Sequence, residues 1–395
     1  MQAASEAAVE APAPVLSRIR RWLSAEAELA EATWRLLCVF VLSIPFSIAL
    51  AQTLLTLSAA IAFRHWWIAG RPSLRTSLDV PIACFLVAAL VGAFVGLDVR
   101  QGIWGARTYL QVIILYLVIA HVPNETRALV VARCFLVGMV VTSAHTVFNA
   151  LSPWPLPNVF PGQMTESGQL LFAIGLTAAL WLYRALWPSF LPYALALHSF
   201  ALLANLKRGV WLGTLATMVV IGLARSWRML VAATVVFAAT VAVVPDVRAR
   251  VENTVRDLYL PGNRYDIWMA SVDVIERFPM GIGRKNGTIL RDYPNIPPNH
   301  KHAHNNFLQI TMESGFLGLA AFTWWMAAFG WLSWRAWRDS APDDAVSRAL
   351  ALAAFSTFIG FHVAGLVEYN FGDTEVLEVV FVMMGIALVL HRARS

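Results

Sequence analysis

Long apolar runs separated by short charged segments constrain the fold of this chain more than any other feature. A helix needs about 20 mostly apolar residues to cross a bilayer, and runs close to that length recur along the sequence. They lie at roughly 36–44, 46–63, 80–97, 103–121, 128–150, 168–185, 189–206, 209–224, 229–245, 315–334, 346–366 and 375–391. The pattern predicts an all-α polytopic membrane protein with about twelve transmembrane helices. The first two runs flank Pro45 and are either two short helices or one kinked helix.

The charge content supports a membrane protein and argues against a nucleic-acid-binding one. Charged residues make up 14% of the 395 residues, whereas a soluble domain carries about 25%. So few charges do not cover the surface of a water-soluble fold of this size. The net charge of +6 would suit a nucleic acid, but the basic residues are scattered between apolar runs, as expected for loops next to lipid. We therefore expect membrane lipids around the chain and no nucleic acid.

The distribution of arginine between loops predicts the topology. Cytoplasmic loops of membrane proteins are enriched in Lys and Arg, and the outer loops 151–167 and 367–374 contain neither residue. This places both termini in the cytoplasm and the long polar segment from Asp246 to Ser314 on the outer face. The loops then assigned to the cytoplasm hold Arg64, Arg71, Arg75, Arg184, Arg225, Arg228, Arg335, Arg338, Arg392 and Arg394.

These patterns divide the chain into four parts. The first part starts with an acidic, Ala-rich stretch and carries its bases later, which is unlike a signal peptide and typical of an amphipathic surface helix. The long outer loop has apolar residues at helical spacing (Ile267, Trp268, Val272 and Ile275), so we expect it to be partly helical. The parts are residues 1–34 (cytoplasmic amphipathic segment), 35–245 (transmembrane helices 1–9), 246–314 (outer loop) and 315–395 (transmembrane helices 10–12 with a short cytoplasmic tail).

Three histidines near the end of the outer loop are the first candidate site. His300, His302 and His304 occupy alternate positions and project to one side of an extended chain. A neutral histidine near its pKa is a general base, and imidazole is also a common metal ligand. The segment lacks the carboxylate or cysteine ligands that accompany histidine in many catalytic zinc sites, so no metal is expected, and a solvated loop is the plain alternative.

Basic residues on the outer side are the second candidate. Lys207 and Arg208 precede Gly209 at the outer end of an apolar run, where a charge is costly without a partner. Guanidinium suits phosphate because it forms bidentate hydrogen bonds, although an interfacial anchor is the simpler interpretation. Arg264 starts an amphipathic segment, and taken alone it suggests a local ion pair with Asp266. Arg107 near another outer end is either an anchor or a contact for an anionic substrate.

Acidic residues and glycines on the outer side give weaker signals. Glu368, Asp373 and Glu375 lie in one short outer loop, where they orient a base, hold a metal or simply follow the charge rule. Glu166 in another outer loop is weaker still. The segment Gly281-x-Gly283 is weak support for a phosphate-binding turn.

The order and spacing of these motifs resemble the O-antigen ligase family of bacterial lipopolysaccharide synthesis. His304-Asn305, nine residues and then Gly315-Phe316-Leu317-Gly318 resemble its hallmark. The Lys-Arg-Gly segment at 207–209 and the Arg-to-Gly-x-Gly run at 264–283 resemble its other two landmarks. The resemblance covers roughly residues 200–330.

The resemblance implies a glycosyltransferase-C-like fold and a metal-independent glycosyltransferase without a cofactor. In that family the enzyme is a multi-pass protein of the bacterial inner membrane with its active site and long loop facing the periplasm. It moves O-antigen from undecaprenyl diphosphate to a sugar of lipid A-core oligosaccharide. The resemblance puts the catalytic histidine at His304 and the essential arginines at Arg208 and Arg264.

A mechanism follows from the residues and the resemblance together. His304 takes the proton from the acceptor hydroxyl, and the arginines bind the diphosphate. We expect inversion at the anomeric carbon, because no nucleophile for a two-step route is evident. Possible supporting residues are Lys207, His302, Asn305, Glu368, Asp373 and Arg107; which acid matters is open. Three alternatives remain: an O-antigen polymerase, a protein O-oligosaccharyltransferase, and, from a different class, a polytopic lipid or glycan transporter.

Overall fold

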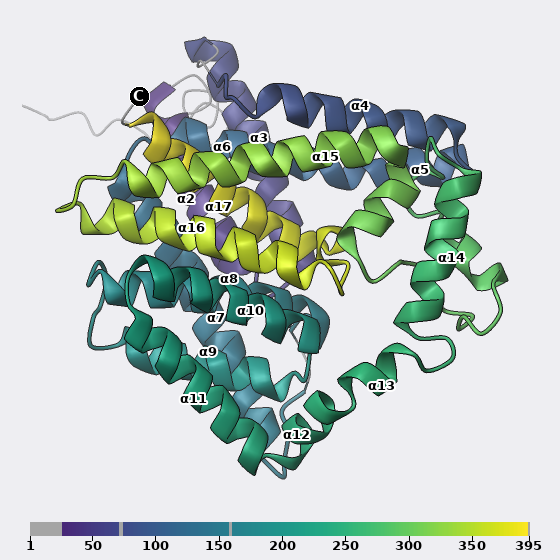
Figure 1. The fold of residues 1–395 in the computed structure, drawn as a ribbon. Helices are drawn as coiled ribbons and strands as arrows, with labels where there is room; N and C mark the ends of the chain where they lie inside the picture. Colours follow the sequence, from purple (N-terminus) through teal and green to yellow (C-terminus); the bar gives the residue numbers. More distant parts are fainter. Residues whose placement is uncertain (1–25, 71–73, 158–159, 394–395) are drawn as a thin grey trace, which may run out of the picture.

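The computed structural model describes residues 26–70, 74–157 and 160–393. Every regular element in these ranges is helical, which confirms the predicted all-α class. Long helices lie side by side in a bundle, and a chain of shorter helices runs along one end of it (Figure 1). Most of the predicted amphipathic segment 1–34 lies outside the described residues. Its last part belongs to a helix that begins at Glu26 and continues into the first apolar run.

Each predicted apolar run lies in one or more helices. The chain breaks at Pro45, so the first two runs form two helices. The run at 103–121 is divided between two α-helices and a 3₁₀ turn. In chain order the helices are α2 (Glu26–Ser43), α3 (Ile48–Ala69), α4 (Asp79–Val95), α5 (Val99–Ala106), η1 (Arg107–Val112), α6 (Ile113–His121), α7 (Glu125–Leu151), α8 (Gln163–Leu182), α9 (Leu191–Ala204), α10 (Arg208–Ala224), α11 (Trp227–Val243), α15 (Asn306–Arg338), α16 (Ala345–Ala364) and α17 (Thr374–Arg392).

Several of these helices are suited to cross a membrane. Within the described residues, six stretches are long and apolar enough, and a seventh is added if α11 and the helix after it, bent by 100°, form one span. Three further apolar helices, α4, α9 and α10, are shorter. The predicted number of about twelve spans is not reached by this measure and stays a prediction.

Burial separates central helices from peripheral ones. Glu375 to Leu390 of α17 are all buried, and α17 packs against α6, α15 and α16. A helix that is apolar on all sides belongs in the middle of a bundle. By contrast, α11 has no buried residue and lies at the edge of the bundle (Figure 1).

The segment from Asp246 to Ser314, predicted to lie on the outer face, is partly helical, as predicted, and has a small core of its own. It contains α12 (Pro245–Glu252), α13 (Thr254–Leu258), α14 (Arg264–Arg277) and η2 (Gly287–Asp292). The buried face of α14 includes Ile267 and Ile275, as expected, but Val272 is exposed. The buried stripe runs through Ile267, Ala270, Ser271, Val274 and Ile275 instead, which is the helical spacing of one face.

A glycine break inside α15 explains both the predicted loop boundary and the Gly-x-Gly segment. The helix begins at Asn306, earlier than the predicted residue 315, but Gly315 interrupts it with φ of 68°. The backbone N–H groups of Ile282 and Gly283 donate to the carbonyls of Met312 and Glu313, 2.8 and 3.0 Å away. A Cβ at Gly281 would lie 2.6 Å from the Glu313 carbonyl oxygen. The Gly-x-Gly segment therefore packs against this break and is not a free phosphate-binding turn.

Candidate functional site

Three helices begin around one short segment of chain. The segment, residues 365–368, follows α16, and the first residues of α10, α14 and α15 contact it. These ends of α10, α15 and α16 lie on the side of the bundle next to α14 (Figure 1). The N-terminus of a helix carries a partial positive charge and unpaired N–H groups. These N-terminal ends therefore offer a negatively charged group a favourable position beside the end of α16.

Glu368 lies at the centre of this arrangement. Its side chain is 4% exposed, and its Oε1 accepts a hydrogen bond of 2.6 Å from Nη2 of Arg264. Its Oε2 lies 3.4 Å from Nδ1 of His304. Gly209 is needed beside it, because a Cβ there would be 2.6 Å from Cγ of Glu368. One buried carboxylate thus joins the predicted histidine to one of the two predicted arginines.

The surroundings keep Glu368 ionised. Burial alone would raise the pKa of its carboxyl group, but contact with His304 and the positive charges of Arg264 and Lys207 outweigh burial and lower the pKa below its usual value. An opposite charge at hydrogen-bond distance favours the charged form of a carboxyl group. Glu368 is therefore a fixed negative charge between basic groups.

Arg264 reaches this carboxylate because it is the first residue of α14. Asn263 caps the helix by accepting a hydrogen bond from the Arg264 N–H. The guanidinium also donates from Nε to the carbonyl of Val367, 3.0 Å away. The prediction of a local ion pair between Arg264 and Asp266 is wrong. The Asp266 carboxylate instead accepts a hydrogen bond from the backbone N–H of Gly262. A helix start is the reason for this difference, because it points residue 264 toward α16 and residue 266 back to the turn.

His304 is held in position by the residue that follows it. Asn305 caps α15, accepting from the N–H groups of Phe307 and Leu308, and donates from Nδ2 to the carbonyl of Leu366 at 2.8 Å. His304 itself has φ of 47°, a left-handed conformation that non-glycine residues adopt rarely and often at functional sites. The His-Asn pair therefore combines a reactive side chain with a cap that ties two loops together.

The other two histidines lie beside His304. The ring centroid of His302 is 4.2 Å from that of His304, and the centroid of His300 is 5.2 Å away. Burial and the neighbouring histidines lower the pKa of His302 to about 3, and burial lowers that of His300 as well. Both rings are therefore neutral at physiological pH.

Lys207 and Arg208, at the start of α10, differ in their contacts. Lys207 is close enough for its charge to act on Glu368. Arg208 turns away, and its Nη1 forms an ion pair of 3.0 Å with Asp257 of α13 and donates to the carbonyl of Arg250. The structure thus brings His304, Arg264, Glu368 and Lys207 together and places Arg208 at the edge, against the outer segment.

The remaining candidates lie in other surroundings. Asp373 caps α17 and accepts a hydrogen bond of 2.6 Å from Thr165. Arg107 lies over the ring of Trp104, 3.3 Å from its centroid, which fits the interfacial anchor. Glu166 accepts hydrogen bonds from Thr146 and Asn205. Within the described part of the chain, neither Asp373 nor Glu166 forms a hydrogen bond or an ion pair with His304.

A buried polar cluster beneath the histidines escaped the sequence analysis. Glu313 accepts hydrogen bonds from Tyr109, Gln309 and Tyr369 at 3.2, 2.8 and 3.2 Å, and Arg284 lies 3.7 Å away. Gln309 also accepts from the backbone N–H of Ala303, between two of the histidines. The available signal was an ionisable residue inside an apolar helix, which usually has a partner and a role.

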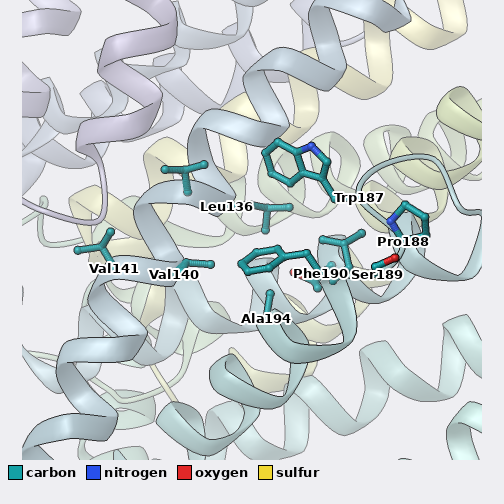
Figure 2. Close-up of a pocket in the computed structure, with 11 residues that line it drawn as sticks. Leu136, Val140, Val141, Trp187, Pro188, Ser189, Phe190 and Ala194 are labelled. Carbon is teal, nitrogen blue, oxygen red and sulfur yellow. The ribbon is translucent and has the colours of Figure 1, made fainter.

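An apolar cavity of the described chain lies apart from this site. It has a volume of about 560 Å³ and lies between α7, α8 and the start of α9. Figure 2 shows Leu136, Val140, Trp187 and Phe190 around it. None of the site residues lines it, and its apolar wall suits hydrocarbon rather than sugar or phosphate.

Comparison with known protein families matches part of the chain to one family. Residues 193–323 match the family model described as O-antigen ligase. This range contains Lys207, Arg208, Arg264 and His304, whereas Glu368 follows it. A search of curated proteins found no significant match.

Proposed function

We propose, because residues 193–323 match the family model described as O-antigen ligase, that the chain is an O-antigen ligase. In this proposal it is a metal-independent inverting glycosyltransferase that moves O-antigen from undecaprenyl diphosphate to a sugar of lipid A-core. The observation that carries the proposal is Glu368, which contacts both His304 and Arg264 where three helices begin. A base and an anion-binding group are thereby fixed side by side.

Donor binding rests on the positive charges around the site. The diphosphate would lie near Arg264, Arg208 and Lys207, at the N-termini of α10 and α14, where N–H groups and the helix dipole favour anions. Arg264 and Arg208 each have a carboxylate partner and keep their charge at any physiological pH. Preorganised positive charge stabilises the diphosphate as the sugar–phosphate bond breaks, which is the role a divalent ion has in other transferases.

Proton transfer rests on the contact between Glu368 and His304. The carboxylate faces Nδ1 of His304, which favours the tautomer with the proton on Nδ1 and a lone pair on Nε2. Nε2 then takes the proton of the acceptor hydroxyl, whose oxygen attacks the anomeric carbon while undecaprenyl diphosphate leaves from the opposite face. The negative charge of Glu368 stabilises the imidazolium that forms, as a carboxylate does in a catalytic triad.

The membrane setting completes the proposal. We place the chain in the bacterial inner membrane with both termini in the cytoplasm, about twelve spans and residues 246–314 in the periplasm. The site then lies at the periplasmic rim, within reach of two lipid-anchored substrates. Asn305 would act through the position of His304, and His302 through its contact with that ring.

Reconstituted transfer with different acceptors tests this proposal. Purified protein in detergent would be mixed with undecaprenyl-diphosphate-linked O-antigen and either lipid A-core, a second donor molecule or an acceptor protein. A ladder on lipid A-core alone would support the ligase. Chain growth on the donor would indicate a polymerase, glycan on protein an oligosaccharyltransferase, and no product from folded protein with matched substrates a transporter.

A further inference from the structure

The three histidines of the outer segment are close enough to share one ligand. One ring nitrogen of each of His300, His302 and His304 lies within 4.8 Å of the corresponding nitrogens of the other two. The segment is anchored on both sides, because Arg291 donates to the carbonyl of His300 and Gln309 accepts from the N–H of Ala303. The cluster is therefore a property of the fold and not of one mobile side chain.

Each of the three rings keeps at least one nitrogen free of hydrogen bonds within the described part of the chain. Nε2 of His300 donates to the carbonyl of His302, so its lone pair is on Nδ1. Nδ1 of His304 faces the Glu368 carboxylate, which leaves Nε2. Nδ1 of His302 is buried and has no hydrogen-bond partner among the described residues. A carbonyl or carboxylate behind a ligating histidine is the usual outer shell of a metal site.

The distances suit a first-row transition metal after a small adjustment. Zinc binds imidazole nitrogen at about 2.0–2.1 Å in tetrahedral geometry, which requires nitrogens about 3.4 Å apart. Because the widest pair in this cluster is no more than 4.8 Å apart, rotation of the rings would have to bring these nitrogens closer together to bind the metal. Imidazole favours zinc, copper and nickel over magnesium and calcium.

We propose that His300, His302 and His304 form an inhibitory zinc site, with water as the fourth ligand. The inhibition rests on the proposed function, because zinc would take the Nε2 lone pair with which His304 accepts the proton of the acceptor. Transfer itself needs no metal in this account. Free zinc in the periplasm would thus lower transfer, and removal of zinc would restore it.

Zinc binding by the full chain tests the site without any assay of transfer. The protein would be purified in detergent with a tag that lacks histidine, and zinc affinity measured by competition with a chromophoric chelator. We expect one zinc per chain, and His300→Gln to weaken binding more than about 100-fold, because loss of outer-shell partners alone costs 10–100-fold. His391→Gln, at the far end of α17, is the matched control and should bind like wild type. Equal affinity for wild type and His300→Gln, or no binding to either, would overturn the site.

Transfer in the presence of zinc tests the inhibition. His300 is outside the groups assigned to transfer, so His300→Gln should transfer like wild type without zinc and need more than about 100-fold more zinc for half inhibition. A chelator should restore the wild type fully. Zinc that binds to the wild type without slowing transfer would refute the inhibition and, with it, His304 as the base. A protein that binds zinc at this cluster but transfers nothing would instead refute the proposed function and leave the metal site supported.

Discussion

Replacement of Glu368 by glutamine is the most informative single change, because it removes a charge and keeps the shape. The carboxylate is 4% exposed and pairs with Arg264, which is 24% exposed, at 2.6 Å. A hydrogen bond to a charged group contributes about 1.5–3 kcal/mol. Since Arg264 is partly solvated and glutamine still offers an acceptor oxygen, we expect the free energy of unfolding to fall by an amount near the lower end of this range.

The loss of transfer should be much larger than the loss of stability. Without the negative charge, His304 loses both its orientation and the stabilisation of its protonated form, so we expect Glu368→Gln to lower the rate about 10²–10⁴-fold, the usual contribution of a general base. Rates would be measured by reconstituted transfer and stability by thermal unfolding in detergent, followed by tryptophan fluorescence. Asp373→Asn is the matched control, because it neutralises an acid of the same loop that contacts Thr165, and asparagine is itself a good helix cap.

The pKa of Glu368 predicts how this stability depends on pH. The folded protein lowers this pKa from the usual 4.5, so the charged form is favoured by folding. The stabilisation is therefore complete above pH 4.5 and is lost as the pH falls through the lower folded value. The difference in unfolding free energy between wild type and Glu368→Gln should shrink over that range. Transfer by folded Glu368→Gln at the wild-type rate would refute the assigned role of Glu368.

Two further changes test other parts of the account. Arg208→Lys keeps the charge but loses the bidentate geometry, so we expect transfer to fall at least about tenfold, the equivalent of one charged hydrogen bond; full activity in reconstituted transfer would reduce Arg208 to an anchor. Gly315→Ala should lower the free energy of unfolding by more than about 1–2 kcal/mol, because residue 315 has φ of 68° and a Cβ there would lie 2.4 Å from the Pro279 carbonyl oxygen. Gly162→Ala, where a Cβ meets nothing within 4 Å and only the N-cap of α8 is affected, is the control. It should lose less stability than Gly315→Ala, and equal thermal unfolding of the two variants would contradict the packing argument.

Hydropathy and local motifs predicted the helices well and the partners poorly. Apolar runs reveal helices because burial or lipid contact acts on every residue of the run, and even the break at Pro45 was recognisable. The partner of Arg264 was not, because Glu368 is 104 positions away in sequence and only the packing of α14 on the end of α16 brings them together.

The role of Gly281 and Gly283 also depends on backbone packing that the sequence does not reveal. Gly281 and Gly283 looked like a turn for phosphate, but a short motif does not say which backbone will approach it, and here that backbone is the break in α15. The cluster of Glu313 and Arg284 was missed for a related reason. Its members come from four separate segments, and the sequence analysis placed Glu313 at the end of the outer segment, whereas it lies inside α15.

Transfer by His304→Ala in the presence of excess chelator tests the central claim most directly. The wild type and the His391→Gln control should form product on lipid A-core at full rate with the chelator present. His304→Ala, folded as judged by thermal unfolding, should be at least about 10²-fold slower. Near-normal transfer by His304→Ala, or a wild type that the chelator silences and divalent ions restore, would contradict a metal-independent transferase that uses His304 as its base.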